Sequence, residues 1–487
     1  MASASTPQPP VYQDGAVAEP WDVDVPANSI ERLGRLIGPE RYAALLEAAA
    51  TALQSLDGAR VWNISSTAHG GGVAEMLTFL CGYASDAGAD ARWMVIDADP
   101  EFFAITKRLH NRLHGAVGDG GHLGRREAAH YEAVLDANVD AIDGRIHRGD
   151  VVFLHDPQTA GLASRLIDYG ARVAWRCHIG SDRTNAFTEE AWAFLQPYLA
   201  PCRTFVFSHA AFVPPRLAGA GVWIIEPSID PLSAKNRPLG RARISSVLAR
   251  IGLLEGDRDG RAPAVMGGAG PFSPDDPLVV QVSRWDYLKD MHGVMRGFAD
   301  RLAGRTDARL ALIGPAVDAV SDDPEGAQVL AECLDAWESL PRRARDAIRL
   351  VTLPMEDAVA NAVMVNAAQR HASVVVQKSL QEGFGLMVSE AMWKSRPVVA
   401  SAVGGIVDQI PPGAGILVED PSDLDTFGDT LASLLAHPAE MATMGRRARR
   451  HVREHFLSDR HLIDYARLLA HMTGRRGSPS PELPPGR

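Results

Sequence analysis

The feature that most constrains the fold of this chain is a regular alternation of short apolar runs with longer amphipathic stretches. Short runs rich in β-branched residues predict buried strands, and the stretches between them predict helices, which is the pattern of parallel α/β architecture. The strands predicted in the first half are Val61–Ser65, Arg92–Asp97, Asp150–His155, Arg172–His178, Thr204–Ser208 and Val222–Glu226. The helices predicted between them are Val73–Tyr83, Glu101–Leu113, Glu127–Ile142, Leu162–Tyr169 and Glu189–Leu199.

The alternation resumes after residues 252–277, a polar and glycine-rich stretch that predicts a linker or an insertion. The strands predicted in the second half are Leu278–Val282, Arg309–Ile313, Ile348–Thr352, Ser373–Gln377, Pro397–Ala400 and Gly415–Val418. The predicted helices include Met291–Leu302, Gln328–Glu338, Glu356–Gln369, Leu386–Trp393 and Leu424–Leu435.

The length of 487 residues exceeds what one hydrophobic core usually organises, so we expect two domains. Residues 29–251 and 278–457 predict two doubly wound, Rossmann-like units, whose strand ends would face a common cleft. Residues 458–473 predict a final helix that is long enough to cross back onto the first domain. The remaining segments, 1–28 and 474–487, lack sustained periodicity and predict disordered tails.

The composition argues against several classes of partner. Lys and Arg number 49 against 60 Asp and Glu, a net charge of −11 that disfavours nucleic-acid binding. No segment has the roughly 20 apolar residues of a membrane span, and no signal-peptide pattern opens the chain, so we expect a cytoplasmic protein. The four cysteines lack CxxC spacing, which predicts buried thiols rather than disulfides or a zinc ribbon. The sequence leaves open whether the chain forms a homodimer.

A glycine-rich turn, His69-Gly-Gly-Gly-Val-Ala-Glu75, follows the first predicted strand and opens a helix. Glycines let the backbone approach an oxyanion, and a helix N-terminus supplies free N–H groups. Gly71 and Gly72 are therefore candidates for binding a phosphate or a sugar hydroxyl; the alternative is a plain tight turn. The segment fits neither the GxGxxG pattern nor the P-loop, which disfavours NAD binding and ATP hydrolysis.

Two cations, Arg284 and Lys289, follow the opening strand of the second half. A guanidinium fork and an ammonium point charge suit a diphosphate, and they would stabilise the charge that grows on a leaving nucleoside diphosphate. The alternative interpretation is solvated surface charge.

Two carboxylates, Glu382 and Glu390, stand eight positions apart after the strand that ends near Gln377. A loop and a helix separate them, so they are unlike the pair about 5 Å apart that a retaining glycosidase needs. We expect Glu382 to accept hydrogen bonds from sugar hydroxyls and Glu390 to accept them from ribose hydroxyls.

These motifs resemble those of a known family. Glu382-Gly-Phe-Gly with Glu390, and the Ser283-Arg-x4-Lys289 segment, resemble the retaining GT-B glycosyltransferases of family four. The first half resembles trehalose glycosyltransferring synthases and the related trehalose phosphorylases. The segments that carry this resemblance are Ser66–Glu75, Phe102–Lys107 with His110-Asn111, His155–Gln158, Trp175–Ile179 and Glu226–Leu232.

The resemblance implies transfer of glucose from a nucleoside-diphosphate glucose, UDP- or ADP-glucose, to glucose, with retention and with trehalose as product. The implied catalytic residues are Arg284, Lys289, Glu382 and His178. The implied donor-binding residues are Gly71, Gly72, Gly383, Phe384, Gly385, Leu386 and Glu390. The implied sugar or acceptor residues are His155, Asp156 and Asn185.

We expect no cofactor and no essential metal ion. The Asp97-Ala-Asp99 motif is similar to a metal site of other glycosyltransferases, but Asp99 before Pro100 is better interpreted as a helix N-cap.

The chain departs from the family pattern at Gly180, where we expect an aspartate after His178-Ile179; Asp182 lies two positions on. Three alternatives therefore stay open. The chain can be a trehalose phosphorylase, a glycosyltransferase with another small-molecule acceptor, or a non-catalytic sugar-nucleotide binding protein.

Overall fold

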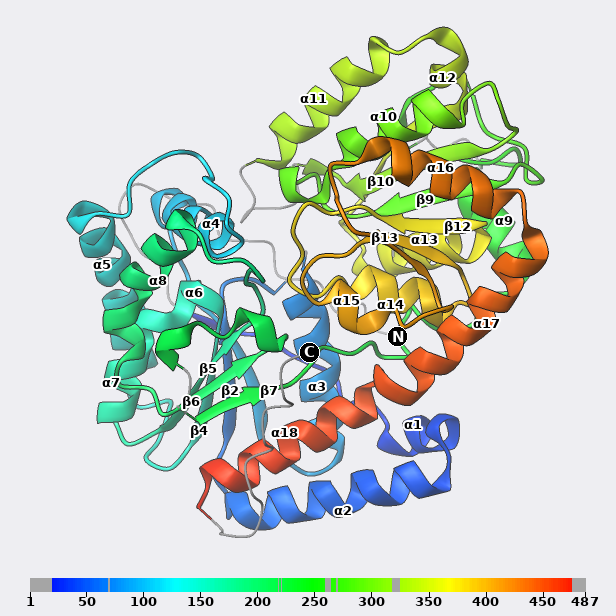
Figure 1. The fold of residues 1–487 in the computed structure, drawn as a ribbon. Coiled ribbons are helices and arrows are strands. Elements are labelled where there is room, and N and C mark those ends of the chain that lie inside the picture. Colours follow the sequence, from blue (N-terminus) through cyan, green and yellow to red (C-terminus); the bar gives the residue numbers. More distant parts are fainter. Residues whose placement is uncertain are drawn as a thin grey trace.

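The computed structural model describes residues 20–68, 71–217, 219, 221–258, 264–268, 270–317 and 325–474. Two sheets, each flanked by helices, form two α/β domains that lie against each other (Figure 1). The first sheet has seven strands in the order β1-β3-β2-β4-β5-β6-β7. Its strands are β1 Trp21–Asp22, β2 Val61–Ser65, β3 Ala91–Val95, β4 Val151–His155, β5 Arg172–Cys177, β6 Thr204–Phe207 and β7 Gly221–Ile224.

The second sheet also has seven strands, in the order β14-β13-β12-β9-β10-β11-β8. Its strands are β8 Val265–Gly267, β9 Leu278–Val282, β10 Arg309–Pro315, β11 Ile348–Leu353, β12 Val374–Gln377, β13 Val398–Ser401 and β14 Ile416–Val418. Within each sheet only the edge strand, β1 or β8, runs antiparallel to its neighbour among the strands described. Parallel α/β architecture is thus confirmed, and each strand predicted from the sequence is present with ends that differ by at most two residues.

Helices of the first domain are α1 Ile30–Ile37, α2 Pro39–Leu56, α3 Gly72–Asp86, α4 Pro100–Leu113, α5 Arg125–Ile142, α6 Asp156–Thr159, α7 Ala163–Asp168 and α8 Ala186–Leu199. The later helices are α9 Arg241–Arg250, α10 Met291–Arg301, α11 Gly326–Glu338, α12 Arg342–Ala347, α13 Ala358–His371, α14 Leu386–Trp393, α15 Ile406–Gln409, α16 Leu424–Leu435, α17 Pro438–His455 and α18 Ser458–Met472. Asp99 caps α4 as predicted, because its Oδ1 accepts a hydrogen bond of 2.8 Å from the Phe102 backbone N–H. Among the described residues, no helix combines the length and apolar character needed to cross a bilayer.

The domain limits differ in detail from those expected. Strand β1 lies inside the predicted tail 1–28, so that tail ends earlier; residues 1–19 and 475–487 lie outside the described residues. Strand β8 lies inside the predicted linker 252–277 and extends the second sheet. Helix α9, which precedes that linker, packs against α13 of the second domain.

Helix α18 packs along α2 at the base of the first domain (Figure 1). An ion pair of 2.6 Å between Arg41 and Asp459 joins the two helices. Helix α18, which follows α17 of the second domain, therefore packs back onto the first domain and links the two domains.

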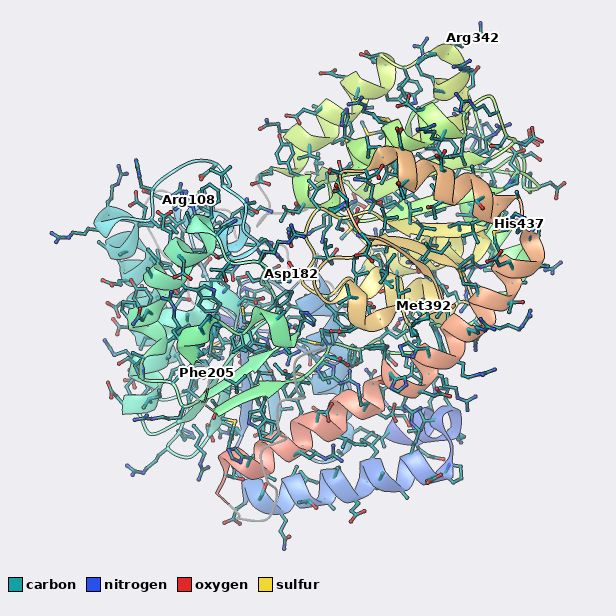
Figure 2. The ribbon with its side chains drawn as sticks, in the orientation of Figure 1. Arg108, Asp182, Phe205, Arg342, Met392 and His437 are labelled. Carbon is teal, nitrogen blue, oxygen red and sulfur yellow. The ribbon has the colours of Figure 1, made fainter. Side chains whose placement is uncertain are left out.

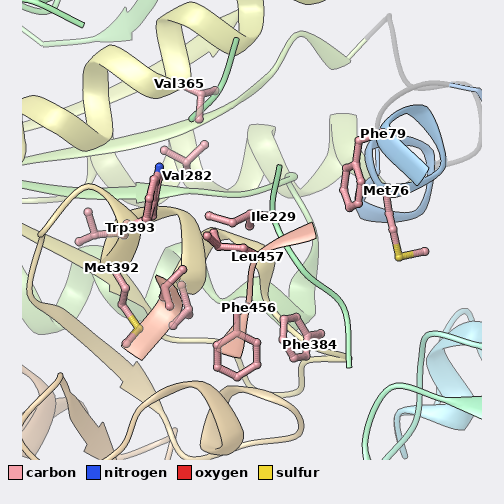
Figure 3. Packing of buried hydrophobic residues seen from close by; sticks show 14 of the residues in the cluster. Met76, Phe79, Ile229, Val282, Val365, Phe384, Met392, Trp393, Phe456 and Leu457 are labelled. Carbon is pink, nitrogen blue, oxygen red and sulfur yellow. The ribbon is translucent and has the colours of Figure 1, made fainter. Parts of the chain in front are cut away.

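A buried apolar cluster runs through the region where the two domains meet (Figure 3). Met76 and Phe79 of α3 contribute from the first domain, and Met392 of α14 contributes from the second. Phe384 stacks obliquely on Phe456 in this cluster, with ring centroids 5.7 Å apart. Burial of such rings stabilises the contact between the two domains.

Candidate active site

The three charged residues that the sequence singled out, Arg284, Lys289 and Glu382, lie where β9 and β12 of the second sheet end. Lys289 Nζ is 2.6 Å from Glu382 Oε1. The other carboxylate oxygen accepts hydrogen bonds from Ser379 Oγ at 3.1 Å and from Gln377 Nε2 at 3.4 Å. The carboxylate is thus held in one orientation by the end of β12, and Lys289 belongs to the same site.

Asp286 joins the cations of this site, and the sequence prediction missed it. Its Oδ2 lies 3.1 Å from Lys107 Nζ and 3.6 Å from Arg284 Nη2. Burial acts to raise the pKa of Asp286, but the positive charges of Lys107, Arg284 and Lys289 outweigh it and bring the pKa below its ordinary value. Asp286 is therefore an ionised carboxylate that ties α4 of the first domain to the strand exit of the second.

Helix α4 brings further polar side chains to the site. Asn111 donates a hydrogen bond of 2.8 Å to Glu325 of the second domain. His110 and His114 are four positions apart, with ring centroids 4.9 Å apart. Burial lowers the pKa of both histidines, that of His114 to about 4. None of these residues was predicted as functional; the signal in the sequence was their spacing on one helix face.

His155 and His178 lie at the ends of neighbouring strands, as predicted, and contact each other. His155 Nδ1 is 3.0 Å from His178 Nε2, and His155 Nε2 is 3.1 Å from Asn63 Oδ1. Because an amide oxygen only accepts, Nε2 of neutral His155 carries its proton and Nδ1 accepts from His178. Burial lowers the pKa of His155 to about 3, and that of His178 also falls, so both rings are neutral at pH 7.

Asp156 acts on the backbone beside these histidines. It adopts a left-handed conformation with φ of 62°, and its Oδ1 accepts a hydrogen bond of 2.7 Å from the His178 N–H. Burial raises the pKa of Asp156 to about 7. In this structure its carboxylate orients the His178 backbone.

Glycines at the domain contact permit a close approach of backbone segments. A Cβ added to Gly383 would lie 2.5 Å from the His178 carbonyl oxygen, and one added to Gly72 would lie 3.1 Å from Leu386 Cδ1. Gly385 has a positive φ of 82° at the start of α14. Gly71 caps α3, whereas His69 and Gly70 lie outside the described residues.

Glu390 forms a separate buried cluster instead of joining Glu382. Its side chain is 0% exposed, and its Oε1 lies 3.4 Å from Lys235 Nζ, which also lies 2.5 Å from Glu75 Oε2. Burial raises the pKa of Glu390 to about 7 despite the charges of Lys235 and Lys394. No hydrogen bond to Oε1 is recorded within the described part of the chain.

Two residues that the sequence assigned to substrate binding, Asn185 and Phe384, also have structural roles that were not predicted. Asn185 caps α8, since its Oδ1 accepts from the backbone of Thr188, and its Nδ2 donates to Gly115. The Phe384 ring belongs to the buried cluster of Figure 3.

Gly180, the departure from the family pattern, has a packing reason: the Phe212 ring occupies the space that a side chain there would need. Asp182, labelled in Figure 2, is exposed.

Two protein-family models match parts of this chain. Residues 63–214 match the family model described as trehalose synthase, N-terminal domain. Residues 358–451 match the model described as glycosyl transferases group 1.

Individual relatives cover nearly the whole chain. The chain is 36% identical over 441 residues to a trehalose synthase of Rubrobacter xylanophilus, which covers 90% of this chain and 96% of that protein. It is 32% identical over 452 residues to a trehalose synthase of Pyrococcus horikoshii, which covers 91% and 97%. The fold resembles the solved α,α-trehalose 6-phosphate synthase of Burkholderia multivorans, with a TM-score of 0.61 and 16% identity over 85% of this chain and 98% of that one. The two facing domains are thus a GT-B fold, as the sequence predicted.

Proposed function

Because this chain belongs to the trehalose synthase family of GT-B glycosyltransferases, we propose that it transfers glucose from a nucleoside-diphosphate glucose to glucose and forms trehalose. The observation that carries this proposal is the joint site between the domains. Lys289 and Glu382 are paired beside Arg284 in the second domain, and Gly383 lies directly against the His178 carbonyl of the first.

The chemistry we propose needs charge stabilisation and positioning more than a protein nucleophile. The bond between the anomeric carbon and the diphosphate oxygen breaks while the acceptor oxygen attacks on the same face, which retains the configuration. The proton of the acceptor hydroxyl passes to the leaving phosphate oxygen. Arg284 and Lys289 stabilise the negative charge that develops on the diphosphate, and a dry, preorganised site makes such charges effective.

We propose that the carboxylates and histidines position the two sugars. Glu382, fixed by Ser379 and Lys289, accepts hydrogen bonds from hydroxyls of the donor glucose. His178 lines the donor-sugar site, with His155 and Asp156 setting its orientation. Glu390 serves the ribose hydroxyls as a carboxylate acceptor, and Lys235, 3.4 Å from its Oε1, holds that carboxylate in place.

The test incubates the purified chain with glucose and a panel of nucleoside-diphosphate glucoses, and identifies the disaccharide and its linkage by NMR. Trehalose from at least one donor supports the proposal; a different disaccharide would overturn the acceptor assignment. Incubation of trehalose with inorganic phosphate or with a nucleoside diphosphate separates the alternatives. Glucose 1-phosphate as product would identify a phosphorylase, whereas binding without any transfer would identify a binding protein.

We also propose that no metal ion is required, because Lys107, Arg284 and Lys289 already supply positive charge at the diphosphate position. Loss of activity in EDTA, with recovery on adding magnesium or manganese, would contradict this. We place the reaction in the cytoplasm; all four cysteines are free and buried, as expected in a reducing compartment.

A further inference from the structure

Helix α4 presents one face to the catalytic charges of the second domain. Lys107, Asn111 and His114 follow at intervals of four and three residues, so they share that face. Lys107 contacts Asp286, and Asn111 contacts Glu325. His114, at the C-terminal end of the helix, is close enough to Lys289 and Glu382 for their charges to act on its pKa.

The hydrogen bond of His114 determines which of its ring nitrogens carries the proton. Nδ1 lies 2.8 Å from the Gly180 carbonyl oxygen, which can only accept, so Nδ1 is the donor. Burial lowers the pKa of His114 to about 4, and the ring is neutral at pH 7. Nε2 is then an unprotonated nitrogen that can accept a hydrogen bond.

The loop opposite His114 offers no side chain at its nearest point. Gly180 lacks one, and Phe212 fills the space beside it. A neutral acceptor nitrogen takes a hydrogen bond from a donor, and the donors that a glucose molecule offers are its hydroxyl groups.

We propose that Nε2 of His114 accepts a hydrogen bond from a hydroxyl of the acceptor sugar and thereby contributes to the choice of acceptor. This role rests on the proposed function and names a recognition residue for its second substrate. Gly180 holds the ring through its carbonyl group, so the loop acts on the acceptor through His114 rather than through a side chain of its own.

Two substitutions separate the two ring nitrogens. The amide nitrogen of His114→Asn can replace Nδ1 and keep the bond to Gly180, but the variant has nothing at the Nε2 position. The longer His114→Gln can place an amide oxygen near the Nε2 position. We expect His114→Asn to raise the KM for glucose about tenfold, the size of one lost hydrogen bond, and His114→Gln to restore part of it. Binding of free nucleoside diphosphate, measured by calorimetry, should be equal in all three proteins.

Monodeoxyglucoses identify the hydroxyl. For the wild type, kcat/KM with one of these monodeoxyglucoses should be about tenfold lower than kcat/KM with glucose. For His114→Asn, kcat/KM with that same monodeoxyglucose should be nearly equal to kcat/KM with glucose. Two results would overturn the proposal. One is an equal fall in kcat/KM in both proteins when the hydroxyl is removed, and the other is an unchanged KM for glucose in His114→Asn.

Calorimetry with glucose in the presence of nucleoside diphosphate gives a readout that does not need turnover. If the wild type transfers no glucose but binds it, and His114→Asn weakens that binding, the proposed transfer fails while the role of His114 stands. If neither protein binds glucose, the role of His114 is wrong.

Discussion

Lys289 Nζ lies 2.6 Å from Glu382 Oε1, although 93 positions separate these residues in the chain. The cation follows β9 and the carboxylate follows β12, which are neighbours in the second sheet. In the function we propose, this pairing brings the cation for the diphosphate and the carboxylate for the donor sugar within one hydrogen bond of each other. Replacement of either residue therefore leaves the charge of the other without its partner.

Replacement of Glu382 by glutamine should lower kcat by about 100-fold or more, while the Kd of free nucleoside diphosphate stays near the wild-type value. The reason is that the amide keeps the shape of the side chain but loses its negative charge and one of its two acceptor oxygens. Initial rates and calorimetry measure the two quantities separately. Arg284→Ala is the comparison, and it should impair turnover and nucleotide binding together. Near-normal turnover of Glu382→Gln would show that this carboxylate has another role.

Replacement of Gly383 by alanine should abolish most activity, because the added Cβ would lie 2.5 Å from the His178 backbone oxygen. A backbone atom cannot rotate away, so the two domains must separate locally. Gly240→Ala is a matched control, since Gly240 has an ordinary φ of −73° and the described residues leave space around its Cβ. We expect the control to keep its activity in the same assay, and equal activity of the two variants would contradict the argument.

Residues that follow the predicted strands could be assigned to one site from the sequence, because the carboxyl ends of parallel strands meet at one edge of a sheet. Such reasoning indicated Arg284, Lys289 and Glu382, whereas His178 was proposed from the family resemblance. The α4 residues could not be found that way, since polar groups spaced along a helix equally fit a solvated face. Lys107 and Asn111 are placed in the site by their contacts with Asp286 and Glu325 across the domain boundary.

The position of Glu390 shows a second limit of the sequence. Its spacing from Glu382 does not predict the ion pair with Lys235, a residue of the segment before α9. The capping role of Asn185, by contrast, could have been predicted from the sequence. Asn-x-x-Thr before an apolar stretch favours a helix cap, and the hydrogen bonds of α8 use that side chain completely.

Replacement of Lys235 by methionine should destabilise the protein by about 3 kcal/mol, because it removes the cation that pairs with both Glu75 and Glu390 and leaves Lys394 as the remaining positive charge near the buried Glu390. The free energy of unfolding in urea measures this loss. The double variant Lys235→Met/Glu390→Gln should recover much of it, since the second change removes the buried negative charge. Strictly additive losses in this cycle would show that the three residues do not act as one cluster.

Acidification should narrow the stability difference between the wild type and His114→Asn. The pKa of His114 is about 4 in the folded protein, below the ordinary value of about 6.5 that applies after unfolding. Between these pH values the unfolded chain binds a proton that the folded protein refuses, so the wild type loses stability as the pH falls from 6.5 towards 4. The variant has no such group. Between pH 7.5 and pH 4.5 the difference in free energy of unfolding should therefore shrink by up to about 3 kcal/mol. A constant difference for His114→Asn would mean that its ring takes up a proton in the folded protein as readily as in the unfolded chain.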